Sequence, residues 1–274
     1  MNIRSERTTI KECMRCLDAK AYIGNSWIEV ITTKRPSTNL SGFKSLKGGK
    51  FLDSKGNVRD YSRKKSREES KSSAIRTFSK LKRLINANFS WDRSELHVTV
   101  TYKYREWNAR KLSEDLKTFC RRLRRHYPEV EYVAFLDVHL SGAFHGHILL
   151  KHRKGKDLHI PRNELDAFWG HGLVRVDTLA GKTETAWYFY EKRCNVQTLS
   201  CYPTSMRIYH HSKGIINPRS ETMTREEIEA LVAGYHLKNA YAYNIIAEVE
   251  RDRELTLNTI SHEEYVKDTE GEQG

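Results

Sequence analysis

The chain has 274 residues, of which 38% are hydrophobic and 30% charged, so it can form one large or two modest domains with a buried core. No apolar run approaches the roughly 20 residues that span a bilayer, and the N-terminus lacks the apolar stretch of a signal peptide. We therefore expect a cytoplasmic protein without a membrane partner. The net charge of +13 favours polyanionic partners.

The positive charge is concentrated in residues 34–84, which hold sixteen Lys or Arg against four Asp or Glu. Within this stretch, residues 34–74 are rich in Ser, Lys, Arg and Gly and predict a linker or a flexible arm. A solvated disordered segment and an arm that neutralises phosphates are both compatible with this composition.

Five cysteines are present, and their odd number argues against a disulfide framework. Cys13 and Cys16 have the spacing of half a zinc site. Ordinary reduced cysteines are the alternative, and we favour it because Cys194 and Cys201 have poor spacing for the other half.

The predicted elements follow one another in a simple order. In the N-terminal third, residues 27–32 predict a strand and residues 75–88 a basic helix with one apolar face. The compact part begins near residue 96. Its expected elements are a strand at 96–102, a helix at 109–126, strands at 131–140 and 144–151, a helix at 161–169, a strand at 173–176 and a helix at 183–194.

One turn signal and one helix-start signal support this order. Ser141, Gly142 and Ala143 predict a hairpin between the strands at 131–140 and 144–151. Further on, Thr224 and Glu227 have the spacing of a capping box, followed by the apolar residues Ile228, Leu231, Val232 and Tyr235 of a last helix. The elements predict an α+β fold, with a central antiparallel β-sheet and helices packed on it.

The sharpest chemical feature is the pair His145 and His147, which lie two residues apart and so on one face of a strand. Asp137 and His139 are spaced in the same way on the neighbouring strand, and the hairpin would bring the two faces together. Histidine and carboxylate ligands of this kind suit a divalent metal that polarises a phosphate. The alternative is a pair of solvent-facing histidines.

A candidate nucleophile lies downstream. Tyr188 and Lys192 are four residues apart on the helix predicted at 183–194, so an ammonium would lie beside a phenol and help to ionise it. Tyr190 is two residues from Lys192. Aromatic residues on a helix are more often part of the core, and spacing alone favours that alternative.

Taken together, these segments resemble the HUH endonuclease superfamily, and most closely the replication initiator (Rep) proteins of phages and rolling-circle plasmids. The resemblance covers roughly residues 95–220. Its motifs, in order, are VTVTY (98–102), FLDVHLSGAFHGHILL (135–150), FWGHGLVRV (168–176), WYFYEK (187–192) and RIYHHSKGIINP (207–218).

The resemblance implies a fold and an activity. It implies an RRM-like nicking domain, which we place at residues 95–260, between an N-terminal region (1–94) and an acidic tail (261–274). His145, His147 and Asp137 would hold Mg²⁺ or Mn²⁺, with His139 as an alternative ligand. A tyrosine would attack single-stranded origin DNA, leaving a 5′-phosphotyrosine and a free 3′-hydroxyl that is later used to close the circle.

Two positions depart from the family's pattern. Gly146 stands where a large hydrophobic residue is usual between the two histidines, which suggests a looser strand. The family's tyrosine motif is usually Tyr-x-x-Lys, whereas Tyr188 is four residues from Lys192 and Tyr190 only two. We favour Tyr188 as the nucleophile, because Phe189 follows it and Lys192 shares its face.

DNA contacts are expected from basic side chains, with a solvated helix face as the alternative for the arginines. The candidates are Arg121, Arg122, Arg124, Arg125 and Lys213. Residues 181–183 resemble the end of a Walker A loop, but Val176 occupies the place of its first glycine, so no nucleotide site is expected there. The chain would then depend on a separate helicase and on the host replication machinery.

Three other functions compete with this interpretation. A relaxase would carry an N-terminal tyrosine, and Tyr22, the tyrosine nearest the start, lies in an unremarkable context. A histidine-triad hydrolase would need a third histidine where Leu149 stands. A non-catalytic nucleic-acid-binding module would bind DNA without cleaving it.

Overall fold

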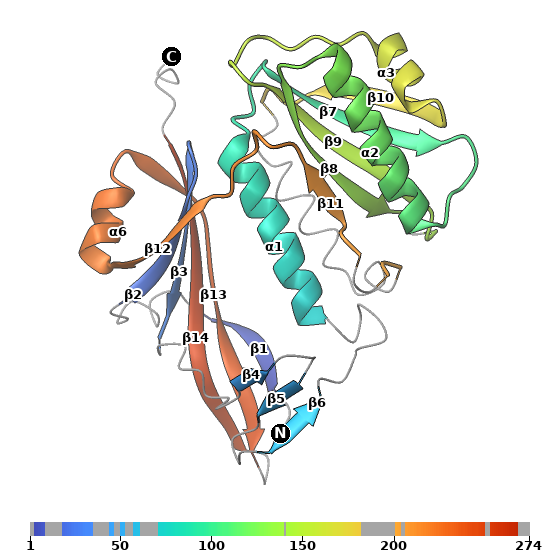
Figure 1. Ribbon diagram of the computed structural model, residues 1–274. Helices are drawn as coiled ribbons and strands as arrows, with labels where there is room; N and C mark the ends of the chain where they lie inside the picture. Colours follow the sequence, from blue (N-terminus) through green and yellow to red (C-terminus); the bar gives the residue numbers. More distant parts are fainter. Residues whose placement is uncertain are drawn as a thin grey trace. The chain divides into compact units, whose positions relative to one another are not determined.

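The computed structural model (Figure 1) describes residues 3–8, 18–34, 44–46, 50–52, 57–60, 71–139, 141–181, 201–203, 206–249 and 253–267. The chain divides into two compact units. One unit is continuous and spans residues 64–217. The other combines residues 1–63 with residues 218–274.

The continuous unit is built on a five-stranded antiparallel sheet with strand order β10-β7-β9-β8-β11. Its strands are β7 (Glu95–Tyr102), β8 (Val130–Val138), β9 (Phe144–His152), β10 (Gly172–Thr178) and β11 (Tyr209–His211). β8 and β9 form the expected hairpin, and Asp137 lies directly opposite His145 in their register.

Two helices cover one face of this sheet, α2 (Ala109–His126) and α3 (Arg162–Trp169). The Asn108 side chain caps the N-terminus of α2 by accepting hydrogen bonds from the backbone amides of Arg110 and Lys111. The apolar stripe of α2 is fully buried. α3 follows Pro161 and ends at Gly170, whose φ of 67° suits a glycine. Both helices match their predicted positions.

The other face of the sheet is covered by α1 (Lys71–Asn88). Leu81, Leu84 and Ile85 of this helix pack against Phe135 and Leu149 of the sheet. Successive strand residues point to opposite faces, so Phe135 and Leu149 also mark the face on which Asp137, His145 and His147 lie.

The second unit contains a six-stranded antiparallel sheet with order β1-β13-β14-β3-β2-β12. Its strands are β1 (Ile3–Thr8), β2 (Asp18–Ile23), β3 (Trp27–Thr33), β12 (Arg219–Thr224), β13 (Tyr235–Val249) and β14 (Arg253–Lys267). The helix α6 (Arg225–Leu231) begins at the predicted capping box of Thr224 and Glu227, and Ile228 anchors it in a small core.

A third, small sheet consists of β4 (Lys44–Leu46), β5 (Lys50–Leu52) and β6 (Val58–Asp60). These strands lie in the stretch expected to be a linker or arm, so part of that stretch has regular structure. Among the described residues, no helix is both long and apolar enough to cross a membrane.

The predicted α+β class is confirmed. One helix boundary was wrong, because α6 ends at Leu231, Gly234 adopts a φ of 85°, and Tyr235 already begins β13. The helix expected at 183–194 lies outside the described residues. Of the domain expected at 95–260, residues 95–217 lie in the continuous unit and 218–260 in the other, while β14 extends into the expected tail.

Candidate metal centre

Three side chains converge at one end of the β8–β9 hairpin. The Asp137 Oδ2 atom lies 3.2 Å from Nε2 of His145 and 3.2 Å from Nε2 of His147, and the two nitrogens are 3.1 Å apart. Neighbouring ligand atoms of an octahedral ion with bonds of about 2.1 Å are separated by about 3.0 Å. The donor set and its spacing therefore fit a small divalent cation bound through two imidazoles and one carboxylate.

The three residues differ in exposure. His147 is buried, with 7% of its surface exposed, whereas His145 and Asp137 are half-buried. The Phe135 ring, directly opposite His147 on β8, lies 5.4 Å from the imidazole between ring centroids. The cluster thus has an apolar inner side and an accessible outer side on which a substrate can approach.

Three further contacts fix the ligands in orientation. Oδ1 of Asp137 accepts a 2.9 Å hydrogen bond from the backbone amide of Val138, so that Oδ2 is the atom presented to the histidines. On the other side, Nδ1 of His147 lies 2.9 Å from Nε2 of His97 and 3.3 Å from Oγ1 of Thr99. Partners of this kind set the tautomer and ring orientation of a metal-binding histidine.

His97 and Thr99 were not predicted as site residues. They lie on β7, where Thr99 is directly opposite His147 in the β7–β9 register. The available signal was the alternation of β7, which places both residues on one face of the strand. The local sequence did not indicate that β7 pairs with β9 on the side away from β8.

His139 is not among the three residues whose ligand atoms converge. β8 ends at Val138, and the backbone of His139 instead closes the hairpin through hydrogen bonds with Gly142 and Ala143. Its imidazole is exposed, and Nδ1 lies 3.2 Å from Oγ of Ser141. The turn therefore takes this residue away from the cluster.

Gly146, between the two histidines, faces α2 on the opposite side of the sheet. A Cβ atom at this position would lie 2.7 Å from Cδ2 of Leu116 and 2.9 Å from Cγ2 of Val100. β9 continues without interruption through this residue. The glycine therefore lets the helix approach the strand that carries the histidines.

The remaining predicted residues are only partly described. Tyr188, Tyr190 and Lys192 lie outside the described residues, as do Cys13 and Cys16. Two of the arginines on α2 contribute to the fold. Nη1 of Arg122 donates to the carbonyl of Phe168 at 2.8 Å, and Arg124 lies 3.9 Å from the buried carboxylate of Glu131.

The other three candidate DNA contacts, Arg121, Arg125 and Lys213, are exposed. Nη2 of Arg121 lies 3.2 Å from Oγ1 of Thr118 on the same helix. These three side chains therefore remain available to a ligand, whereas Arg122 and Arg124 are held by contacts within the unit.

Comparison with known protein families gives a match over the segment that carries the cluster. Residues 95–193 match the model of a family of replication-associated proteins, and the description of that family names ORF2. No significant match was found among curated proteins or among solved structures. The matched segment is about a third of the chain and includes Asp137, His145 and His147. Over residues 95–193 the chain is therefore similar to this replication-associated protein family, in agreement with the resemblance to replication initiators.

Proposed function

We propose that this chain initiates rolling-circle replication by nicking and rejoining single-stranded origin DNA. The observation that carries the proposal is the convergence of Asp137, His145 and His147 within the segment that matches the replication-associated family. Such a donor set favours a divalent metal that polarises a phosphate, and the resemblance to replication initiators supplies the tyrosine nucleophile.

Asp137, His145 and His147 would hold Mg²⁺ or Mn²⁺, which would offset the negative charge that develops on the scissile phosphate. The hydroxyl oxygen of Tyr188 attacks the phosphorus, and the bond from phosphorus to the 3′-oxygen breaks. That oxygen takes up a proton as the phenol loses one. The products are a 5′-phosphotyrosine and a free 3′-hydroxyl.

The covalent intermediate retains the energy of the phosphodiester bond, so a 3′-hydroxyl can later displace the tyrosine without ATP. Lys192 would orient the attacking phenol, and Tyr190 is the alternative nucleophile. A separate helicase would supply unwound DNA, and the host replication machinery would extend the 3′-hydroxyl.

The proposal is tested by incubating the full chain with Mn²⁺ and single-stranded oligonucleotides that tile its own genetic element. A covalent protein–DNA adduct on a denaturing gel is the expected result. Tyr188→Phe should abolish the adduct, and Tyr190→Phe should leave it. The opposite pattern would reassign the nucleophile to Tyr190, and an adduct that persists in the double variant would contradict a tyrosine mechanism at this motif.

A second variant tests the metal site. His147→Ala should remove metal-dependent cleavage while the affinity for single-stranded DNA changes little. Unchanged cleavage in this variant would exclude His147 as a ligand. A non-catalytic nucleic-acid-binding module predicts DNA binding without an adduct in any metal.

A further inference from the structure

The loop at residues 103–108, which joins β7 to α2, exposes two large aromatic side chains. Tyr104 is 77% exposed and Trp107 is 56% exposed. Basic residues accompany them, because Lys103 and Arg105 lie in the same loop and Arg110 follows in the first turn of α2, and all three are exposed. Aromatic rings beside cations are typical of surfaces that bind unpaired nucleotides.

This loop is fixed to the strand that carries the metal ligands. The backbone amide of Phe144, the residue before His145, donates a 2.7 Å hydrogen bond to the carbonyl of Glu106. The Trp107 ring also lies against the hairpin turn, since a Cβ atom on Gly142 would be 3.2 Å from its Cζ3 atom. The aromatic loop is thus held next to the β8–β9 hairpin.

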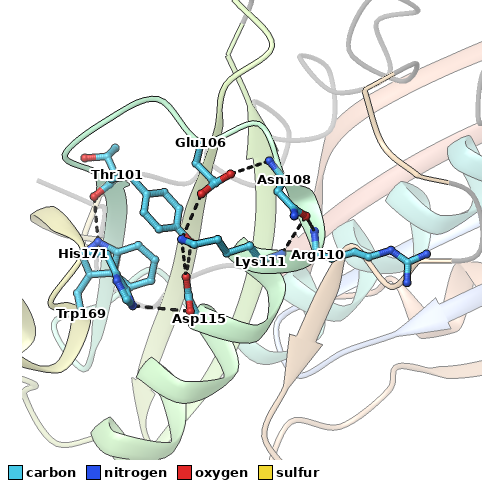
Figure 2. Close-up of polar contacts among 9 residues, drawn as sticks. Thr101, Glu106, Asn108, Arg110, Lys111, Asp115, Trp169 and His171 are labelled. Carbon is cyan, nitrogen blue, oxygen red and sulfur yellow. Dashed lines mark hydrogen bonds and ion pairs between the residues drawn. The ribbon is translucent and has the colours of Figure 1, made fainter.

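Figure 2 shows the polar network that orders the loop where it joins α2. The Glu106 carboxylate accepts a 2.9 Å hydrogen bond from the amide of Asn108 and lies 3.1 Å from Nζ of Lys111. Lys111 also lies 3.2 Å from Asp115, which accepts a 2.6 Å hydrogen bond from the Tyr102 hydroxyl. Lys111 lies between two carboxylates, so the positive charge of the loop surface comes from the exposed Lys103, Arg105 and Arg110.

A pocket of about 500 Å³ is lined by Arg110 and lies between α2 and the segment that leads into β11. Its lining includes Arg110, Ser113, Glu114, Lys117, Arg207 and His210. Cations outnumber acids in this set, and the single carboxylate, that of Glu114, is 2.7 Å from Nζ of Lys117. The pocket therefore suits an anionic ligand with several charges.

The inner part of the pocket is polar and built into the fold. Oγ of Ser113 lies 2.8 Å from Nε2 of His210, whose neighbour Tyr209 pairs with Phe135 of β8. Burial, together with the nearby cation of Lys117, lowers the pKa of His210 to about 4. This imidazole is neutral at pH 7, so the positive charge of the pocket comes from Arg110, Lys117 and Arg207 at its rim.

We infer that the β7–α2 loop and the α2–β11 pocket together form a track for single-stranded DNA on the α2 face of the sheet. The loop end of this track contacts the β8–β9 hairpin, whose other face carries the candidate metal centre. Bases stack on Trp107 and Tyr104, and phosphates lie along Arg110, Lys117 and Arg207. Arg110 joins the two parts, since it lines the pocket and lies three residues after Trp107. The inference rests on the proposed function for its choice of ligand, and it adds the residues that hold the strand.

The test measures binding without cleavage. The full chain is titrated into a fluorescein-labelled 20-nucleotide oligo(dT) in EDTA, and fluorescence anisotropy gives the affinity. Stacking of one base is worth about 1–3 kcal/mol, so Trp107→Ala should weaken binding roughly 5- to 150-fold. Trp107→Phe should restore most of the affinity. Leu237→Ala, which removes a comparably exposed apolar side chain from the other unit, should leave the affinity for oligo(dT) unchanged.

The cationic part has its own readout. For single strands, each lost phosphate contact reduces the slope of log affinity against log salt by about 0.7. The triple variant Arg110→Ala, Lys117→Ala, Arg207→Ala should therefore lower that slope by about 2. The triple variant Lys154→Ala, Lys156→Ala, Arg162→Ala removes three exposed cations outside the loop and the pocket, so it is the matched control and should leave the slope close to that of the wild type.

The outcomes separate the inference from the proposed function. If the wild-type chain forms the covalent adduct but Trp107→Ala and the pocket triple variant bind oligo(dT) as the wild type does, the track is wrong and the nicking proposal stands. An equal loss of affinity for duplex DNA would also overturn the track, because stacking needs unpaired bases. If these variants lose oligo(dT) affinity while the wild type forms no adduct, the track stands and the nicking proposal fails.

Discussion

The Nε2 atom of His97 lies 2.9 Å from Nδ1 of His147, the ring nitrogen that faces away from Asp137. For Nε2 of His147 to offer its lone pair to a metal, Nδ1 must carry the proton, and His97 is placed to accept it. Loss of such a partner typically weakens metal binding 10- to 100-fold. We expect His97→Ala to lower the affinity for Mn²⁺ by about that factor, measured by isothermal titration calorimetry or by the EPR signal of free Mn²⁺.

The role of His97 is separable from a general structural effect. His97→Gln retains a hydrogen-bond acceptor and should restore part of the Mn²⁺ affinity. His159→Ala removes an exposed histidine elsewhere in the same unit and should have no effect. An affinity for Mn²⁺ that is the same in His97→Ala and in the wild type would show that His147 does not depend on this partner.

Gly146 couples the metal strand to α2. A Cβ atom would come within 2.7 Å of Leu116 and 2.9 Å of Val100, and both side chains are fully buried. Overpacking of this kind costs about 1–3 kcal/mol. We expect Gly146→Ala to lower the free energy of unfolding by that amount, measured by urea denaturation.

A double variant identifies the cause. Leu116→Ala alone should destabilise the unit, because it removes a buried leucine. Combined with Gly146→Ala, it should cost less than the sum of the two single changes, because the new methyl group occupies space that Leu116 leaves. Strict additivity would mean that the two positions do not compete for space.

Much of the continuous unit could be predicted because its signals are local. The apolar stripe of α2 and the turn at 141–143 predicted a helix and a hairpin. The hairpin in turn predicted that the strand face with Asp137 and His139 lies next to His145 and His147, and Asp137 does lie opposite His145. His97 was missed because it comes from β7, which is separated from β9 by α2 and β8. The fit of Gly146 likewise depends on Leu116 of α2, which sequence spacing does not connect to it.

The other unit could not be predicted from local patterns. Its sheet pairs strands from both ends of the chain, as in β1 with β13 and β3 with β14. Such pairs are more than two hundred residues apart, and the period-2 pattern of a strand does not specify its partner. The same limit applies to Trp107, whose exposure results from the course of a loop between two well-predicted elements.

Metal binding should stabilise the continuous unit, because the three ligands converge only when β8 and β9 are paired. A ligand at 100 times its Kd stabilises the folded state by about 2.7 kcal/mol. We therefore expect saturating Mn²⁺ to raise the Tm of the wild-type chain and EDTA to reverse the rise. Asp137→Asn should show little or no rise, and an equal rise in this variant would place the ion elsewhere.

Glu95 gives the continuous unit a pH dependence that is independent of the metal. Its side chain is only 1% exposed, and it accepts 2.8 Å hydrogen bonds from the amides of Ser90 and Trp91. Burial outweighs these hydrogen bonds and raises the pKa of Glu95 from 4.5 to about 7. The folded chain thus keeps a proton at pH values where the unfolded chain has lost it.

This difference in pKa makes the folded state less stable as the pH rises. The contribution of Glu95 to stability is fully present below pH 4.5 and is lost as the pH rises from there through about 7. The loss across this window is about 3 kcal/mol at 1.36 kcal/mol per unit of pKa. Glu95→Gln cannot titrate, so its free energy of unfolding should vary less between pH 5 and pH 8 than that of the wild type. The variant loses one hydrogen-bond acceptor at every pH, which changes its free energy of unfolding by the same amount throughout. The readout is therefore the change of that free energy with pH. A change equal to that of the wild type would show that Glu95 is ionised in both the folded and the unfolded state.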